Sequence, residues 1–326
     1  MASYITAVND LIVSRAAQLP NAVLYGENID NGSRISGLSR NLKTPPGGRI
    51  INVGDCEATH CGVGFGMLLN GGCAVLFCKQ LDFLLLGLDH FVSTYNVIRC
   101  HKYPKSLGSF TIITIVCDQG LQGPQSSFNA LGDICSLARV EGYTITNDQD
   151  AAHVLNSQVG KTGFRFIALS QALFPTEFLR LDLVYAAPDS SLFQYTEGDE
   201  ATIVCFNFSL AKGHVLQQKL SARGMRSSLF SLNYAVHQNW ERIRQSVQRT
   251  GKVIVIDDSK SVHLPGYRLL YEIGDSCPQA RKIAISRGSD VDFGVSPDAL
   301  QIDYDAIVSQ LCAPGSSFAT ISRDSW

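Results

Sequence analysis

The chain has 326 residues, of which 45% are hydrophobic and 17% are charged, and its formal net charge is -2. This length and apolar content are enough for two domains with buried cores. Because no basic cluster interrupts the sequence, its charge pattern excludes an extended electrostatic footprint for nucleic acid or for an anionic membrane. We therefore expect small-molecule or protein partners.

The N-terminus lacks a positively charged region followed by an apolar one, and the longest apolar runs, such as 81–88, are too short to span a bilayer. A cytoplasmic protein is the expectation. The ten cysteines are scattered, and none forms a C-x-x-C pair, which is typical of reduced core residues. Cys56, His60 and Cys61 could hold a metal together, but no second ligand pair follows at zinc-site spacing, so we predict no metal site.

Apolar residues at helical spacing over 5–19 predict a first helix, and the run 22–25 predicts a short buried strand. The same alternation continues along the chain. Further strands are predicted at 49–53, 73–78, 110–117, 143–146 and 164–169, and further helices at 58–69, 81–100, 128–140 and 148–159. Because these strands are continuous apolar runs that alternate with helices, we expect an α/β fold with a doubly wound parallel sheet covered on both faces.

A stretch with proline, paired serines and acids at 186–200 is typical of a linker. After it, strands are predicted at 201–206, 226–232, 252–256 and 282–286, and helices at 211–223, 238–248 and 264–273. This pattern predicts a second, smaller doubly wound domain. We therefore divide the chain into a larger domain at 1–187, a smaller one at 188–312 and a flexible tail at 313–326.

Glu57 is the first candidate for a functional residue. It follows the predicted strand at 49–53 and comes directly before an apolar, glycine-rich helix. An acid in this position lies at the carboxyl edge of a parallel sheet, where open α/β sheets bind ligands. The alternative is a solvated glutamate at a helix start, where the helix dipole favours negative charge.

Four segments of the first domain follow one another in a recognisable order: Gly26-Glu27-Asn28, then 36–41, then Arg49-Ile50-Ile51-Asn52, then Glu57. This order resembles the β subunit of thiamin-diphosphate-dependent 2-oxo acid dehydrogenases, which corresponds to the pyrimidine-binding and C-terminal domains of transketolase. The resemblance covers about 5–286. It implies a pyrimidine-binding domain at 1–187 and a domain similar to the transketolase C-terminal domain at 188–312.

The resemblance implies thiamin diphosphate as the cofactor, and Glu57 stands where this family keeps its cofactor-activating glutamate. A carboxyl group hydrogen-bonded to a ring nitrogen of the aminopyrimidine favours the imino tautomer, which can then remove the proton from the thiazolium carbon. Phe83 matches the aromatic residue that packs against the pyrimidine ring in the family. An ordinary core aromatic is the alternative for Phe83.

Three more residues are candidates by the same resemblance. Glu27 resembles an acid near the subunit interface between two cofactors, although a capping or solvated loop role is the alternative. Gln80 could hydrogen-bond the pyrimidine edge or simply begin a helix. His60 lies one turn beyond Glu57 and could face the same cleft, or it could be a surface or core histidine. The predicted catalytic residues are thus Glu57, Glu27 and His60, and the predicted cofactor-binding residues are Glu57, Phe83 and Gln80.

Three segments depart from the family. Where the dehydrogenase β subunits carry a Gln-His-Ser-Gln loop, this chain reads Gly123-Pro124-Gln125-Ser126-Ser127, so Pro124 replaces the histidine. Proline neither donates nor shuttles a proton, which argues against transfer of an acyl group to a lipoyl arm. In the second domain, the family's Arg-Thr-x-x-Pro-x-Asp turn has become Asn233-Tyr234-Ala235-Val236-His237, and its Glu-Gly-Gly has become Asp257-Asp258-Ser259.

No segment resembles the Gly-Asp-Gly motif with a downstream Asn that holds magnesium and the diphosphate in this superfamily. The resemblance therefore implies that an α-type partner subunit supplies the Mg2+ and diphosphate site, in an α2β2 heterotetramer.

The leading hypothesis is a β-type subunit of a split, transketolase-like enzyme in specialised metabolism. The enzyme would cleave a ketose or decarboxylate a 2-oxo acid donor, and then transfer the resulting fragment by carboligation or two-carbon transfer. A true 2-oxo acid dehydrogenase β subunit of the pyruvate type and a non-catalytic assembly subunit are the alternatives. A dinucleotide-binding protein is disfavoured, because Gly62-Val63-Gly64-Phe65-Gly66 lies within a predicted helix and suits close helix packing.

Overall fold

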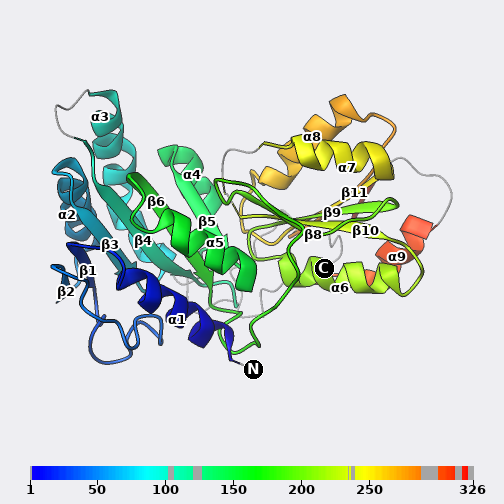
Figure 1. Cartoon of the computed structure of the whole chain (residues 1–326). Helices are drawn as coiled ribbons and strands as arrows, with labels where there is room; N and C mark the ends of the chain where they lie inside the picture. The colour runs from blue at the N-terminus through cyan, green and yellow to red at the C-terminus, as the bar shows by residue number, and fades with distance from the viewer. Residues whose placement is uncertain are drawn as a thin grey trace.

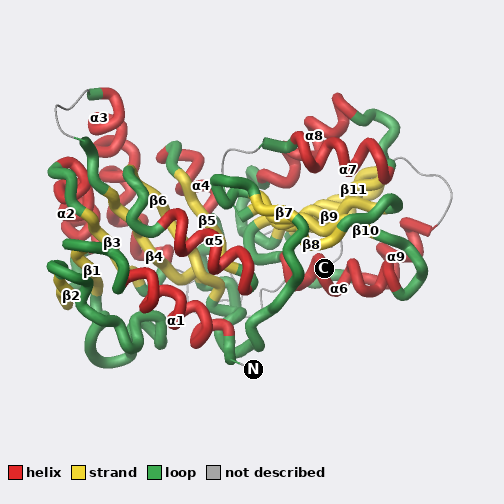
Figure 2. The backbone as a smooth tube through the Cα atoms, in the orientation of Figure 1, coloured by secondary structure: helices red, strands yellow, loops and turns green. Residues whose placement is uncertain are grey.

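The computed structural model describes residues 2–101, 106–119, 127–233, 235, 239–287, 300–312 and 318–321. This part of the chain forms two α/β units that lie side by side (Figures 1 and 2). Each unit is built around one sheet with helices on both faces. Among the described residues, no helix is both long enough and apolar enough to cross a membrane.

The first sheet has six strands in the order β2-β1-β3-β4-β6-β5. Every neighbouring pair in it is parallel. The strands are β1 (Ala22–Gly26), β2 (Arg49–Asn52), β3 (Cys73–Cys78), β4 (Ser109–Val116), β5 (Glu141–Ile145) and β6 (Gly163–Ser170). The predicted α/β fold with a doubly wound parallel sheet is confirmed.

Helices cover both faces of the first sheet because its strands are apolar on both sides. They are α1 (Tyr4–Ala16), α2 (Glu57–Leu69), α3 (Tyr95–Cys100), α4 (Leu131–Ala138) and α5 (Asp148–Gln158). In β3, Val75 and Phe77 share a core with α1 and α5, whereas Ala74 and Leu76 share a core with α2. Successive side chains of a strand point to opposite faces, so one apolar run serves two cores.

The helix predicted over 81–100 is confirmed in its extent, but it is not one regular α-helix. This segment forms a 3-10 helix, η1 (Leu81–Gly87), a short π-helix, η2 (His90–Thr94), and then α3. A Cβ atom at Gly87 would lie only 2.5 Å from Cys61 Sγ. Close packing of this segment on α2 therefore takes precedence over regular helical hydrogen bonding.

The second sheet has the strand order β13-β12-β11-β9-β10-β8-β7. Its strands are β7 (Tyr185–Ala186), β8 (Leu192–Thr196), β9 (Ala201–Phe206), β10 (Ser227–Leu232), β11 (Lys252–Asp257), β12 (Arg281–Ser286) and β13 (Phe318–Ile321). The pairs from β13 to β10 are parallel, whereas β8 is antiparallel to β10 and β7 to β8. The second unit is therefore also doubly wound, with an antiparallel edge.

Helices α6 (Leu210–Ser221) and α9 (Tyr304–Cys312) cover one face of the second sheet, and α7 (Glu241–Thr250) and α8 (Pro265–Ser276) cover the other (Figure 1). The core under α6 is continuous with the core between the first sheet and α1 and α5. The two units are thus joined by shared apolar packing.

Two predicted irregular segments contain strands. The expected linker at 186–200 holds β8, whose buried Phe193 and Tyr195 belong to the shared core. In the expected tail, residues 318–321 form β13 and pair with β12. The rest of that tail lies outside the described residues. The sequence also gave no prediction of α9.

Candidate functional site

The order of the first sheet marks a candidate ligand-binding edge. The chain runs from β1 outward to β2 and then returns to β3 on the other side of β1. A doubly wound sheet binds ligands at such a reversal, outside the carboxyl ends of the strands. In the register of the sheet, Gly26 pairs with Asn52 and with Phe77. The residues that follow Gly26, Asn52 and Phe77 must therefore lie close together at one edge of the sheet.

The loop after β1 is anchored on β2. The amide N–H of Ile29 donates to Asn52 Oδ1 over 2.9 Å, and Ser39 Oγ donates to the carbonyl of Ile29 over 2.7 Å. The loop between them includes three consecutive non-glycine residues in the left-handed region, Arg34, Ile35 and Ser36, with φ of 48°, 52° and 56°. The burial of Ile29 and Ile35 holds this strained turn in place.

Glu57 is the first residue of α2 and is half-buried. His60, one turn further, is buried, and its ring lies edge-on against Tyr25, with 6.5 Å between the ring centroids. Burial lowers the pKa of His60, while the Glu57 carboxylate and a hydrogen bond to the Gly54 carbonyl oppose that effect. The structure therefore brings Glu57 and His60 together, with His60 neutral at pH 7.

Glu27 and Asp55 join this group from the ends of β1 and β2. Their carboxyl groups share a hydrogen bond, and Glu57 lies close enough to repel Glu27. Desolvation, Asp55 and Glu57 together raise the pKa of Glu27 to about 7, and the nearby Lys79 acts in the opposite direction. Because nearby like charges oppose ionisation, Glu27 titrates near neutral pH rather than in the acid range.

Residues at the end of β3 and just after it form the rest of the candidate site. Burial raises the pKa of Cys78 to about 12, and its thiol donates to the carbonyl of Gln80 over 3.2 Å. Gln80 precedes η1, and the Phe83 amide donates to the Gln80 carbonyl over 3.3 Å. Phe83 is half-buried and packs against the core that α2 shares. Gln80 directly precedes η1, and Phe83 lies within it. Because η1 packs against α2, both residues lie near the helix that carries Glu57 and His60.

The segments that depart from the family are described only in part. Pro124 and residues 120–126 lie outside the described residues, as do Tyr234, Val236 and His237. Of the first loop, Ser127 is described, and its amide, with that of Phe128, donates to Asp82 Oδ1 over 3.2 and 3.0 Å. Asp82 therefore connects η1 to the end of this loop.

Sequence reasoning missed two members of the cluster, Asp55 and Lys79. Asp55 lies two residues before Glu57, so the strand-end argument already applied to it. Lys79 directly follows β3, but its proximity to Glu27 depends on the pairing of β1 with β3, which one sequence does not reveal.

Among the described residues, no group of histidines, cysteines and acids could hold a metal ion. Glu27, which titrates near neutral pH, lies beside Lys79, so this group of acids suits proton exchange rather than a divalent cation.

The protein therefore belongs to the class of α/β proteins in which two doubly wound units are joined through a shared core. No protein family model matches the chain, and a search of curated proteins also finds no match. Solved structures do match. One, described as a split-gene transketolase in an inactive β4 tetramer, has a TM-score of 0.64 and 14% identity over 94% of this chain and 96% of its own.

A transketolase from Campylobacter jejuni matches with a TM-score of 0.63 and 11% identity. The match covers 94% of this chain and 44% of the Campylobacter chain, so this protein spans less than half the length of that enzyme. The chain has a transketolase-like fold. The resemblance inferred from the order of its sequence landmarks is therefore confirmed at the level of the fold.

Proposed function

We propose that this chain is the β-type subunit of a split, thiamin-diphosphate-dependent transferase or decarboxylase related to transketolase. The observation that carries the proposal is the cluster of Glu27, Asp55, Glu57 and His60 at the reversal point of the first sheet. The proposal is supported by the fold that this chain shares with a split-gene transketolase over nearly the full length of both chains.

The residues of the cluster fit the pyrimidine half of the cofactor. Glu57 would hydrogen-bond a ring nitrogen and exchange a proton with it, and Phe83 would hold the ring by stacking. Glu27 and His60 would set the charge around Glu57, and Gln80 would bond the ring edge. When bound, thiamin diphosphate supplies the carbon nucleophile that attacks the donor carbonyl.

The proposal also requires a partner chain that supplies the rest of the cofactor site. We assign the diphosphate and Mg2+ to an α-type subunit, because the cluster offers only the pyrimidine side. Apolar side chains on the elements that carry the cluster provide a docking surface: Ile51, Val63 and Leu86 are 40%, 49% and 68% exposed. An α2β2 assembly would cover these residues.

The first test is binding by calorimetry. The chain alone, titrated with thiamin diphosphate and Mg2+, should give no measurable heat of binding, and addition of a partner chain that carries the Gly-Asp-Gly and Asn motif should restore binding. Tight, Mg2+-dependent binding by the chain alone would contradict the split site. If the reconstituted complex also fails to bind, the non-catalytic assembly subunit becomes the better interpretation.

The second test concerns the chemistry. Because Pro124 replaces the histidine of the dehydrogenase loop, we propose ketose cleavage or 2-oxo acid decarboxylation with carboligation or two-carbon transfer. The reconstituted complex should release an aldehyde or form a carboligation product without lipoamide. Formation of acyl-dihydrolipoamide at the rate of donor consumption would instead favour a 2-oxo acid dehydrogenase.

A further inference from the structure

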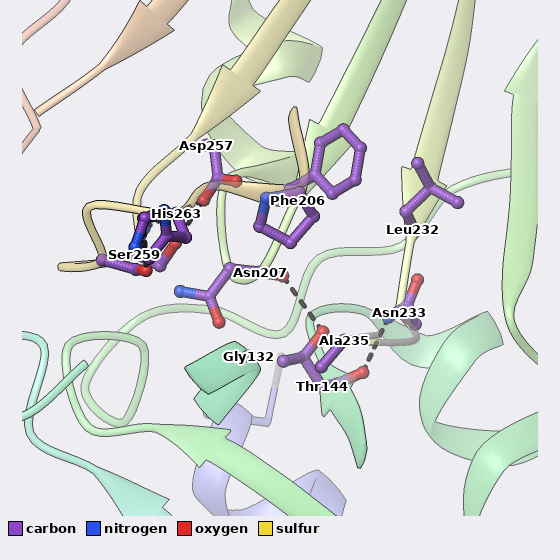
Figure 3. A pocket seen from close by; sticks show the side chains of 12 residues that line it. Gly132, Thr144, Phe206, Asn207, Leu232, Asn233, Ala235, Asp257, Ser259 and His263 are labelled. Carbon is purple, nitrogen blue, oxygen red and sulfur yellow. Dashed lines mark hydrogen bonds between the residues drawn. The ribbon is translucent and has the colours of Figure 1, made fainter. Parts of the chain in front are cut away.

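The strand ends of the second sheet enclose a pocket against the first unit (Figure 3). Its walls come from the ends of β9, β10 and β11, from the loop before α8, and from α4 and β5 of the first unit. The lining residues that carry the argument are Gly132, Phe206, Asn207, Leu232, Asp257 and Pro265. None of the side chains assigned to the proposed cofactor site lines it.

Sheet topology marks this pocket as a ligand position. From β9 the chain moves to β10, and it then crosses back to β11 on the opposite side of β9. The reversal point of the second sheet therefore lies between β9 and β11, whose ends carry Asn207 and Asp257. Asn207 has a left-handed backbone, with φ of 56°, and strain of this kind is concentrated at ligand sites.

Asp257 is the polar group in the pocket wall whose hydrogen bonding is incomplete. Its side chain is 2% exposed, and Oδ1 accepts from the amide and hydroxyl of Ser259 over 3.1 and 2.6 Å. Oδ2 is buried and makes no hydrogen bond of good geometry, although the Gly266 amide lies close enough to lower the pKa of this carboxyl group. Figure 3 shows this carboxyl group on the side of the pocket where Phe206 lies. A buried carboxylate oxygen without a hydrogen bond of good geometry favours a ligand that donates one.

The charges around the pocket favour a cation. No lysine or arginine is among the described residues of its wall. Two cations nearby contact Asp258: Lys212 Nζ lies 3.5 Å from its Oδ2, and Arg287 Nε donates to its carbonyl over 2.8 Å. Arg287 also lies close enough to act on the charge of Asp257, but it does not line the pocket. Burial, with a contribution from Asp258, raises the pKa of Asp257 to about 6, so this carboxyl group is ionised at pH 8.

The size of the pocket and its apolar surface further restrict the kind of ligand that it can bind. The centres of water-sized molecules fit in about 30 Å³ of the pocket, whereas about 10–15 Å³ suffices for a single water. The pocket therefore admits only a few non-hydrogen atoms. Phe206, Leu232 and Pro265 add apolar surface to the pocket wall, which a short hydrocarbon chain would contact.

We propose that this pocket binds a small primary ammonium ion with a short aliphatic chain, whose ammonium group donates to Asp257 Oδ2 and whose carbons lie against Phe206 and Leu232. The site is independent of the proposed cofactor chemistry, so its test needs neither cofactor nor partner.

Saturation-transfer NMR at pH 8 on the full chain tests the proposal with three molecules of one shape, propylammonium, 1-propanol and propionate. We expect propylammonium to bind at least tenfold more tightly than the other two, and Asp257→Asn to remove that preference. Equal affinity for propylammonium and 1-propanol, or an unchanged preference in Asp257→Asn, would overturn the proposal.

A second variant guards against misfolding of Asp257→Asn. A Cβ atom at Gly132 would lie 3.7 Å from the Ala235 carbonyl oxygen and 4.0 Å from Pro265 Cγ, which are ordinary contacts. Gly132→Ala should therefore fold, narrow the pocket and weaken propylammonium binding at least threefold. Gly66→Ala, at a glycine outside the pocket where an added Cβ atom meets nothing within 4 Å, is the control and should bind as the wild type does. An unchanged affinity in Gly132→Ala would place the ligand elsewhere.

Discussion

The carboxyl groups of Glu27 and Asp55 share a hydrogen bond, although 28 positions separate them in the sequence. The parallel pairing of β1 with β2 brings them together, because the strands end at the same edge. Glu57 adds a third acid to this edge. The pKa of Glu27, raised to about 7, is what distinguishes this edge from an ordinary solvated loop.

The first prediction is that Glu27→Gln changes how stability depends on pH. An ordinary glutamate in the unfolded chain has a pKa of about 4.3, whereas the folded value is about 7. Between these values the native state binds more protons, so Glu27 makes stability fall as pH rises through this window. Glu27→Gln should therefore gain stability relative to the wild type between pH 4.5 and 7.5, measured by urea unfolding.

Asp30→Asn serves as the control for this comparison, since it removes an exposed carboxylate from the same loop. Its difference from the wild type should stay nearly constant over the same pH range. A pH-independent difference for Glu27→Gln would mean that Glu27 is an ordinary solvated acid.

The second prediction uses two glycines on α2. A Cβ atom at Gly64 would lie 2.3 Å from Cζ of the buried Phe110 ring, whereas nothing lies within 4 Å of one at Gly66. Gly64→Ala should lower the free energy of unfolding by about 1–3 kcal/mol through overpacking. Gly66→Ala should raise it by about 0.5–1 kcal/mol, because alanine favours helix. Denaturant unfolding measures both, and equal effects would refute the packing argument.

The third prediction concerns the strained turn after β1. Ser36 is exposed and has φ of 56°, a conformation that glycine adopts without steric cost. Ser36→Gly should raise the free energy of unfolding by up to about 1 kcal/mol. Ser33→Gly is the matched control, since Ser33 is exposed in the same loop and has no positive φ; it should lower stability by about 0.4–1 kcal/mol. Thermal unfolding that ranks Ser33→Gly above Ser36→Gly would contradict this explanation.

Sequence alone predicted most strands of both sheets, because strands buried on both faces are continuous apolar runs. It missed β8, whose flanks are rich in serine, proline and acids. It predicted the helical extent of 81–100 but not the change from 3-10 to π and α-helix within it, since an apolar pattern does not reveal that Gly87 must approach Cys61. Local composition fails where a contact between distant segments decides the conformation.

Part of the candidate site could likewise be predicted from the sequence, and part could not. Glu57 could be found from its position after a strand, and the resemblance supported Glu27, His60, Phe83 and Gln80. The raised pKa of Glu27 could not be predicted, because it depends on the register of two strands, which brings Asp55 beside Glu27. The pocket at Asp257 was also missed, since its walls come from both units.

The last prediction tests the role proposed for Glu57. Glu57→Gln nearly preserves shape but removes the proton that a carboxyl group can share with a ring nitrogen. In the complex reconstituted with its partner, deuterium exchange of the cofactor's thiazolium proton should slow by at least about 100-fold, which corresponds to about 2.7 kcal/mol of barrier. Because Glu57 is half-buried at the start of α2, assembly and calorimetric cofactor binding should change much less. Asp30→Asn should exchange at the wild-type rate. If Glu57→Gln also exchanges at that rate while binding the cofactor, Glu57 serves only as a helix-start acid.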